Sequence, residues 1–325
     1  MTTPPHQSNQ SSQPSSLLDL PGAVAGNGVD APVAAHYGSF NAEQRTLESG
    51  EGFVDLSHRD VLRIEGPDRL TWLHSLTTQF FLDLAPRVWT DALVLSPQGH
   101  VEHAFSGYDD GEAFVAHTEP GAAAALLGFL ERMKFMTRVE LSDVTDTVAV
   151  TWRASSSGTT YELVPRDQLT AYAAAAGPAC GMWAFEALRI ARGEPRHQVD
   201  TDARTIPNEA GWVGPAVHLD KGCYRGQETV ARVHTLGRPP RRLTLLHLDG
   251  TENRLPEQGA ELRHGERVVG FVGSSARHHE LGPIALAMVK RNVPLEATLE
   301  VDSMPAAQEV VVDPEVGLHV RPKLR

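Results

Sequence analysis

The chain has 325 residues, a hydrophobic content of 41% and a formal net charge of −12 at pH 7. Its length allows two or three folded units, and its acidic balance argues against nucleic acid as a partner, because nucleic-acid binders present a basic face. Two cysteines, Cys180 and Cys223, are too few for a disulfide framework and fit a reducing compartment.

The first residues lack the features of a secretory signal, since positions 1–16 contain no Lys or Arg and no apolar run follows them. The longest apolar run, from Ala122 to Leu130, is too short to span a bilayer. We therefore expect a cytoplasmic protein without a membrane partner.

Residues 1–33 are rich in Ser, Gln, Pro, Asn and Gly and carry almost no charge. Such a composition buries too little apolar surface to offset the entropy lost on ordering. The sequence therefore predicts a disordered tail over residues 1–33. From residue 34 the pattern changes to a compact mixture of helix and strand signals, which we expect to form one region extending to residue 238.

The strands predicted in this region are short apolar or alternating runs at 53–56, 61–64, 89–95, 101–105, 113–116, 139–141, 148–152 and 161–164. The predicted helices have apolar residues at spacings of three and four: one beginning at 66–68, then 121–133, 167–176 and 182–192. Turn residues at 97–99 and 109–111 make hairpins of the neighbouring strands. Hairpins with interposed helices predict the α+β class with largely antiparallel sheets.

After Pro239 and Pro240 the pattern becomes all-β. Gly, Pro, Asp and His-Gly turns separate short predicted strands at 243–248, 261–263, 268–273, 284–290, 297–301 and 309–312. This regular spacing is typical of a small barrel or sandwich, so we expect a separate C-terminal β unit over residues 239–325.

One octapeptide, residues 221–228 with the sequence KGCYRGQE, stands out for its chemistry. Cys223 lies between two glycines, with a cation on either side and a predicted helix start just behind it. Positive charge and a helix N-terminus both favour the thiolate, which is the reactive form of cysteine. The alternative from the residues alone is an incidental loop cysteine.

This octapeptide resembles the K-G-C-Y-x-G-Q-E signature of the YgfZ family, folate-binding relatives of the glycine-cleavage T-protein that are linked to maintenance of iron–sulfur enzymes. Shorter segments resemble T-protein elements in the same order along the chain: 53–59, 76–79, 187–190 with Gly193, 207–211, 273–275 and 281–287. The resemblance runs from about Tyr37 to the C-terminus. It implies two interleaved ferredoxin-like units of T-protein type and a C-terminal small β-barrel, arranged around a channel that holds tetrahydrofolate or a one-carbon derivative.

The chain departs from the aminomethyltransferases at their carboxylates. Their acidic pair falls here on His103 and Ala104, and their pterin-binding glutamate falls at about Gly158. Glu102 is the nearest carboxylate, but strand alternation directs it to the face opposite His103. The departures argue against authentic aminomethyl transfer.

The resemblance supplies the candidate site residues. Cys223 is the expected reactive group, with Lys221 and Tyr224 beside it as candidate catalytic residues. The candidate ligand-binding residues are Arg189, His103, Glu209, Gly222, Gly226, Gln227 and Glu228. His103 stands where T-protein has a carboxylate and would hydrogen-bond the pterin.

Several of these residues have a simpler interpretation. Arg189 follows Glu186 by three residues, so a surface ion pair is as reasonable as a contact with a folate carboxylate. Gln227 and Glu228 could simply satisfy N–H groups at a helix start. Tyr224 could pack rather than contact the thiol.

The fifteen histidines show no H-x-x-x-H or H-E-x-x-H spacing, so we expect no metal site and no resident cluster. The leading hypothesis is a tetrahydrofolate-binding, YgfZ-like protein that uses Cys223 in assembly, repair or protection of iron–sulfur enzymes, with client or assembly proteins as partners. The alternatives are a genuine folate-dependent methyl or aminomethyl transferase, and a folate-binding regulatory module in which the cysteine is incidental.

Overall fold

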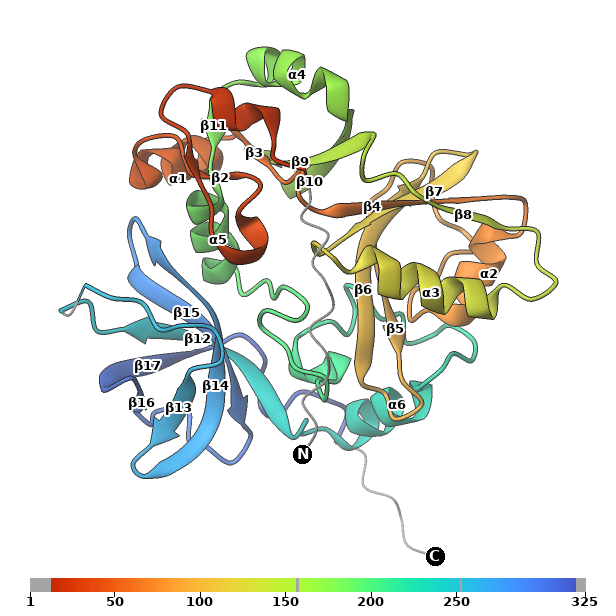
Figure 1. The fold of residues 1–325 in the computed structure, drawn as a ribbon. Coiled ribbons are helices and arrows are strands. Elements are labelled where there is room, and N and C mark those ends of the chain that lie inside the picture. Colours follow the sequence, from red (N-terminus) through yellow and green to blue (C-terminus); the bar gives the residue numbers. More distant parts are fainter. Residues whose placement is uncertain (1–12, 156–157, 252, 320–325) are drawn as a thin grey trace, which may run out of the picture.

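The computed structural model describes residues 13–155, 158–251 and 253–319, which form a mixed α/β body and a closed β-barrel (Figure 1). The helices are α1 (Phe40–Glu48), α2 (Arg69–Leu76), α3 (Ala123–Met133), α4 (Leu169–Ala176), α5 (Met182–Ala191) and α6 (Gln227–Leu236). Four short 3-10 helices span Ser16–Asp19, Gly28–Asp30, Arg166–Gln168 and Pro207–Glu209. None of the helices in these ranges has the length and apolar character needed to cross a membrane.

The first sheet of the body has four strands in the order β10-β9-β3-β11. Its strands are β3 (Phe53–Asp55), β9 (Val148–Ser155), β10 (Gly158–Pro165) and β11 (Ala179–Cys180). Alternation along β3 directs Phe53 to a core with α4 and Val54 to a core with α1 and α5. The sheet is therefore covered on both faces.

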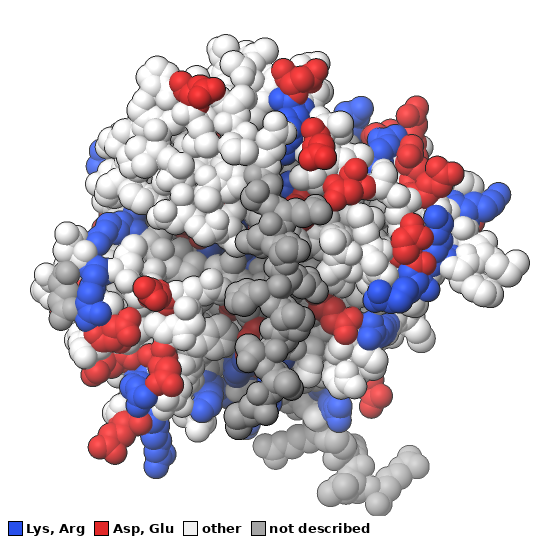
Figure 2. All heavy atoms as spheres, viewed as in Figure 1, with Lys and Arg blue, Asp and Glu red and all other residues white. Residues whose placement is uncertain are grey.

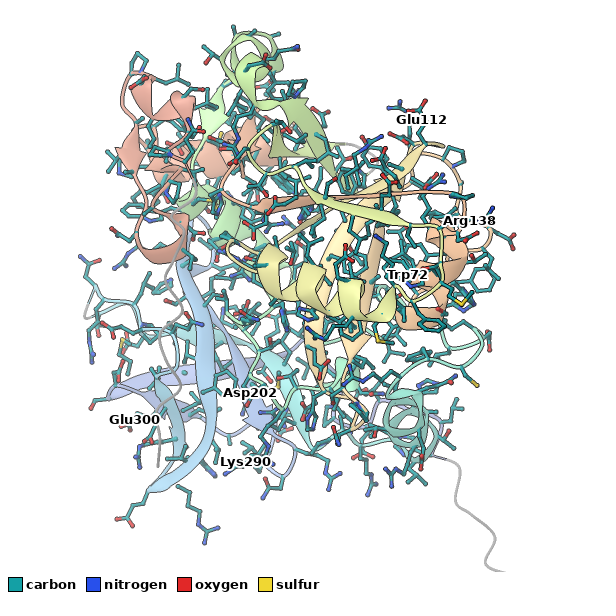
Figure 3. All side chains as sticks on the ribbon, turned by 45° about the vertical axis from the view of Figure 1, so that its right-hand side comes forward. Trp72, Glu112, Arg138, Asp202, Lys290 and Glu300 are labelled. Atoms are coloured by element: carbon teal, nitrogen blue, oxygen red, sulfur yellow. The ribbon has the colours of Figure 1, made fainter. Side chains whose placement is uncertain are left out.

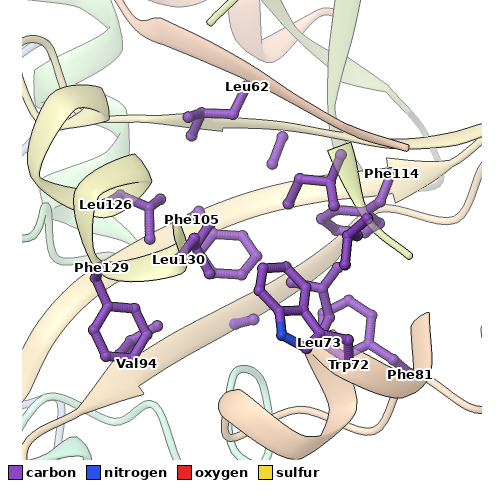
Figure 4. Close-up of a cluster of buried hydrophobic side chains, with 14 of the residues drawn as sticks. Leu62, Trp72, Leu73, Phe81, Val94, Phe105, Phe114, Leu126, Phe129 and Leu130 are labelled. Carbon is purple, nitrogen blue, oxygen red and sulfur yellow. The ribbon is translucent and has the colours of Figure 1, made fainter. Parts of the chain in front are cut away.

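The second sheet has five antiparallel strands in the order β5-β6-β7-β4-β8. Its strands are β4 (Asp60–Glu65), β5 (Thr90–Leu95), β6 (Val101–Asp109), β7 (Ala113–Thr118) and β8 (Glu140–Asp143). Helices α2 and α3 cover one face through a core that includes Trp72, Phe105 and Phe129 (Figure 4). Because β4 to β8 lie in the chain between β3 and β9, the two sheets are interleaved.

The C-terminal barrel closes in the order β12-β15-β14-β13-β16-β17. Its strands are β12 (Arg241–Leu248), β13 (Glu261–His264), β14 (Arg267–His278), β15 (Gly282–Lys290), β16 (Leu299–Val301) and β17 (Met304–Val310). Ala187 and Ile190 of α5 pack against barrel residues, which joins the barrel to the first sheet.

The last strand differs from the prediction of a strand at 309–312, because β17 begins five residues earlier. Asp302 and Ser303 both have left-handed φ, so a tight turn after β16 starts the new strand at Met304. Ala306 and Ala307, which follow, have low strand propensity, but they form a strand because β12 and β16 pair with them in the closed barrel.

The prediction of disorder is wrong for residues 13–33. They form two 3-10 helices, and β1 (Val24–Ala25) pairs with β2 (Ala34–His36). Leu17 and Val33 are fully buried in cores built mainly by other segments, and the Ser15 hydroxyl donates to Asp55. A polar segment can order in this way because it docks on surface that already exists. Residues 1–12 of the predicted tail lie outside the described residues.

Figure 2 shows one face of the molecule, on which acidic and basic side chains are intermixed over the second sheet and the barrel. The upper part of this face, over the first sheet, is mostly uncharged. On this face the acidic side chains are thus interspersed with basic ones and form no separate acidic patch.

Candidate functional site

A cavity of about 520 Å³ is lined by residues of both sheets and of the segments between them and the barrel. Strands β5, β6 and β7 of the second sheet form one wall, and Tyr161 of β10 with Phe185 of α5 contributes another. The segments 193–197 and 210–216 complete it. The cavity therefore lies where both sheets and the connection to the barrel meet.

Three polar side chains form a row across the second sheet. Asp91 on β5 lies directly opposite Ser106 on β6, and Ser106 lies opposite His117 on β7. Residues opposite one another on antiparallel strands project to the same face, and all three line the cavity. Asp91 is exposed to solvent, although desolvation by its surroundings raises the pKa of its carboxyl.

Arg59 and His117 form a buried pair at this cavity, with 3.4 Å between Arg59 Nη1 and His117 Nδ1. Arginine only donates, so Nδ1 accepts and the proton of the neutral ring lies on Nε2. Burial and the Arg59 charge keep the pKa of His117 well below its usual range. Arg59 is only 5% exposed and His117 3%, yet Arg59 Nε and His117 Nε2 have no hydrogen-bond partner among the described residues.

The orientation of Arg59 is fixed by its neighbours. Its guanidinium lies 5.5 Å from the ring centroid of Tyr161 and 5.8 Å from that of Phe185. Its Nη2 lies 3.3 Å from Glu119. These contacts fix the Arg59 guanidinium at the cavity wall, where Nε remains a buried donor without a partner among the described residues, which is costly.

A buried ion network surrounds Arg196, which also lines the cavity. Its guanidinium donates to Asp30 at 3.1 Å, to Glu119 at 2.9 Å and to Glu186 at 3.1 Å. Asp30 also contacts His58 Nε2 at 2.9 Å; despite burial, this hydrogen bond and the charge of Arg196 hold the pKa of Asp30 far below its usual range. The N-terminal segment thus supplies one carboxylate of the network.

Arg189 is buried rather than at the surface, so the predicted surface pair with Glu186 forms inside the protein. Its Nε donates to Glu186 at 2.8 Å, and its Nη1 donates to Asp200 and to the Glu194 carbonyl, each at 2.9 Å. Its Nη2 also donates to Glu186. A ligand carboxylate would have to displace one of these partners, so the predicted folate contact stays a prediction.

His103 and Ala104 project to opposite sides of β6. The His103 ring packs 5.9 Å from Phe129 of α3, on the helix-covered face, and burial lowers the pKa of His103 to about 4. Ala104 lines the cavity, and His103 is not among the lining residues. Strand alternation thus turns His103 away from this cavity, and its predicted contact with the pterin stays a prediction.

Glu209 is fully buried and both of its carboxylate oxygens are engaged within the protein. It accepts from the Ile206 N–H at 3.1 Å and from Arg241 at 2.8 and 2.9 Å. Arg241 of β12 also donates to Asp202 at 2.7 Å, and Figure 3 labels Asp202. The contacts of Glu209 therefore link the 3-10 helix 207–209 to the barrel, and its ligand role stays a prediction.

Cys223 is exposed, as the sequence predicts for a reactive thiol, but it is not among the residues that line the cavity. Lys221 is buried, and its ammonium donates to the carbonyls of His74, Thr77 and Gln79 at the C-terminal end of α2. Burial lowers the pKa of Lys221 to about 8. The predicted cation thus binds carbonyls at and just after the C-terminal end of α2, where cations are favoured.

Tyr224 packs in an apolar cluster with Leu93, Leu95 and Val101. Its ring centroid lies 5.1 Å from Lys221 Nζ, and burial raises the pKa of its hydroxyl to about 12. These contacts match the packing alternative and anchor the cysteine loop to the second sheet.

Gly226 has a φ of 80° immediately before α6, and Gln227 and Glu228 are the first two residues of that helix. The predicted helix start behind the cysteine is confirmed. A Cβ at Gly226 would lie 2.5 Å from the Ser96 carbonyl oxygen, so glycine permits close contact with the β5–β6 hairpin. At Gly222 an added Cβ would meet open space.

One group in the described ranges gathers metal-ligand atoms: Glu48, His278 and His279. Glu48 contacts His279 Nε2 at 2.7 Å. His278 Nδ1 accepts from the N–H groups of Glu280 and Leu281 at 3.2 Å each, which places the neutral ring's proton on Nε2 and leaves that nitrogen a donor. The expectation of no metal site stays a prediction.

The sequence analysis missed Asp30, Asp91 and Arg196 as site residues. Asp91 could have been found by extending strand alternation across the predicted hairpin, since it lies two residues before Leu93, the partner of Ala104. Asp30 lies in a segment that composition assigned to disorder, and nothing local marks it. Arg196 gains its role only from long-range partners.

No family model matches the chain. The chain is similar to a "Putative transferase At1g60990, chloroplastic" from Arabidopsis thaliana, with 25% identity over 304 residues, 78% of this chain and 69% of that protein. It is also similar to an "Aminomethyltransferase" from Nostoc sp., with 34% identity over 134 residues, 39% of this chain and 35% of that enzyme.

Among solved structures, the glycine cleavage system aminomethyltransferase T from Bartonella henselae matches with a TM-score of 0.77 at 16% identity, covering 93% of this chain and 97% of that one. The predicted fold, a T-protein-type α+β body with a C-terminal small β-barrel, is therefore confirmed.

Proposed function

We propose that this chain is a tetrahydrofolate-binding protein of the YgfZ family that uses Cys223 in assembly, repair or maintenance of iron–sulfur enzymes. The observation that carries the folate part is a cavity in a T-protein-type fold whose largely apolar lining includes a few charged and polar side chains. Its unpaired Arg59 Nε and His117 Nε2 fit a heterocycle that brings hydrogen-bond acceptors. The YgfZ assignment rests on the octapeptide at 221–228.

The exposure of Cys223 supports a role for its thiol toward a partner outside the chain. Cys180 is buried, and burial raises its pKa to about 12, so it stays a protonated, inaccessible thiol at neutral pH. Cys223 is open to solvent on the loop before α6. Of the two cysteines, it is the one that a client or assembly protein can reach.

The folate proposal is tested by calorimetric titration with tetrahydrofolate. Saturable binding is expected for the wild type and a large loss for Ala104→Trp, because an indole at position 104 would fill part of the cavity. Ala124→Trp on the exposed side of α3 adds the same bulk outside the cavity and should leave binding unchanged. Wild-type protein without saturable binding would refute the folate part.

The iron–sulfur part is tested in cells that lack their own YgfZ-type protein. The wild type should restore the activity of iron–sulfur enzymes, and Cys223→Ser should fail to do so at equal protein level. Cys180→Ala is the matched cysteine control and should restore activity. Full restoration by Cys223→Ser would make the cysteine incidental and favour a folate-binding regulatory module.

A folate-dependent aminomethyl or methyl transferase is the second candidate, and the names of the two sequence relatives favour it. The alanine at position 104, which lines the cavity where the resemblance places a carboxylate, argues against it. Purified protein is assayed with an aminomethylated lipoyl carrier and tetrahydrofolate. Turnover to methylenetetrahydrofolate would establish the transferase.

A further inference from the structure

Two adjacent apolar side chains project from the loop between α3 and β8. Phe135 and Met136 are each 87% exposed, and no other large apolar side chain in the described ranges is as exposed. Met133, the last residue of α3, adds a third side chain that is 42% exposed. We call these three residues the apolar knob. Apolar side chains exposed singly need no explanation, whereas neighbouring ones mark candidate interaction sites.

The loop that carries the knob is fixed at both ends. At its start, the Trp72 indole of α2 donates to the Met133 carbonyl at 3.2 Å (Figure 3). At its end, Arg138 donates to Asp68, the residue before α2, through its backbone N–H at 2.9 Å and its guanidinium at 2.7 Å. Between these anchors Phe135 has a φ of 27°, a left-handed value that costs energy for a residue other than glycine. A partner therefore meets a knob whose exposed position is already held by the chain, which lowers the entropy cost of binding.

The charges around the knob are mainly positive. Arg132 is exposed and has no ion pair in the part of the chain that the structure describes. The other charged side chains are Lys134, 3.7 Å from Glu131, and Arg138 with its partner Asp68, so three cations face two carboxylates. Methionine, aromatic and arginine side chains are the types enriched in protein interfaces, and a net positive surface favours an acidic partner. The net charge of −12 disfavours an anionic lipid surface instead.

The knob and the cysteine loop are anchored on the same two helices. Lys221 binds carbonyls at the end of α2, and Trp72 of that helix, which is about 12 Å long, holds the knob. On α3, the first knob residue follows Phe129 by one turn on the same face, and the Arg225 guanidinium lies 5.7 Å from the Phe129 ring centroid. An interface of ordinary size covers about 800 Å² on each partner and is roughly 30 Å across. One partner can therefore contact the knob and Cys223 together.

We propose that the apolar knob is the docking point for the client or assembly protein on which Cys223 acts, and that this partner presents an apolar pocket with an acidic rim. The inference rests on the proposed function, and adds to it the surface that selects the partner and the chemistry of the partner's surface. In this division the knob binds and Cys223 reacts, so the loss of each has a different signature.

The test uses cells that lack their own YgfZ-type protein, with the level of the introduced chain set by a titratable promoter. Loss of an interface hot spot weakens binding by about tenfold or more. Phe135→Ser/Met136→Ser should therefore need at least about tenfold more protein than the wild type to reach the same iron–sulfur enzyme activity, and should reach the same maximum. Cys223→Ser should fail at every level. Leu281→Ser/Val310→Ser removes two exposed apolar side chains from the barrel and should match the wild type.

Two measurements on the purified knob variant separate docking from damage. Its urea unfolding midpoint and its rate of Cys223 alkylation should equal those of the wild type, because the knob side chains are exposed. Arg132→Glu keeps the knob and reverses one charge beside it, so it should shift the dose dependence in the same direction.

The outcomes distinguish the docking role from the proposed function. If the wild type restores activity and the knob variant does so with the same dose dependence, the docking role is refuted and the proposed function stands. If the wild type restores nothing at any level, both are refuted. Sedimentation of the purified chain, alone and with phosphatidylglycerol vesicles, tests the other occupants. Self-association or vesicle binding that the knob variant loses would assign the knob to a second copy or to a lipid surface, and would refute docking of a client.

Discussion

Arg196 is the residue whose loss we expect to destabilise the fold most. Its side chain is buried and contacts Asp30, Glu119 and Glu186, which come from three separate parts of the chain. Arg196→Met keeps most of the side-chain volume and removes the charge. Three carboxylates are then left close together without this cation, and breaking a buried ion pair by removing one partner costs about 3 to 5 kcal/mol.

This loss is large against the total stability of a folded domain, about 5 to 15 kcal/mol. It is measured by urea unfolding at pH 7, followed by tryptophan fluorescence and far-UV circular dichroism. The control is Arg263→Met in the barrel, because Arg263 and its partner Glu261 are both largely exposed. A surface pair of this kind contributes about 0 to 1 kcal/mol.

A double variant separates the ion network from simple packing. Asp30→Asn removes one of the carboxylates that Arg196→Met would leave without its guanidinium partner. The two changes together should therefore cost less than the sum of the single losses, because residues in one network are not additive. A loss for Arg196→Met no larger than that of the Arg263→Met control, or a strictly additive double variant, would refute the reasoning.

Three further predictions concern pH, backbone and thiols. Burial would raise the pKa of Glu119, but Arg196 and Arg59 lower it to about 2. The ionised carboxylate therefore stabilises the folded state by about 3 kcal/mol above pH 4.5, and this stabilisation is lost as the pH falls toward 2. In Glu119→Gln the urea midpoint should fall less steeply from pH 5 to pH 3 than in wild type, and parallel curves would contradict this. Gly226→Ala should lower the free energy of unfolding by about 1 to 3 kcal/mol, because Gly226 has a left-handed φ and a crowded Cβ position. Gly222→Ala, where a Cβ meets open space, should lower it by under about 0.5 kcal/mol; thermal unfolding measures both. Iodoacetamide should label Cys223 before Cys180, read by peptide mass spectrometry, since only the first is exposed; equal rates would count against it.

Local patterns were sufficient for most of the fold. Turn residues and short apolar runs locate the strands of both sheets apart from the two-residue β11, and the helix behind Gly226 begins where its glycine indicates. Such signals depend on neighbours in the chain, which a sequence displays directly. The ordering of residues 13–33 depends instead on buried contacts such as Leu17 and Asp30 with distant segments, which composition does not report.

In the candidate site, too, some features follow from the local sequence and others only from contacts with distant segments. The exposure of Cys223 follows from its glycine-rich surroundings, and the opposite directions of His103 and Ala104 follow from alternation once the strand is known. The partners of Arg189 and Lys221 do not follow from the sequence. The sequence alone gives Lys221 no partner, and only the fold shows that carbonyls at and just after the end of α2 bind its ammonium.

The cavity and the exposed cysteine are distinct sites in this structure, and that separation has a measurable consequence. The cavity wall at 212–216 immediately precedes the cysteine loop in the chain, yet Cys223 does not line the cavity. A ligand in the cavity therefore does not cover the thiol. Saturating tetrahydrofolate should leave the rate of Cys223 alkylation unchanged both in the wild type and in Ala104→Trp. Protection of Cys223 by tetrahydrofolate in the wild type, absent in Ala104→Trp, would show instead that ligand binding rearranges the cysteine loop and that the two sites act together.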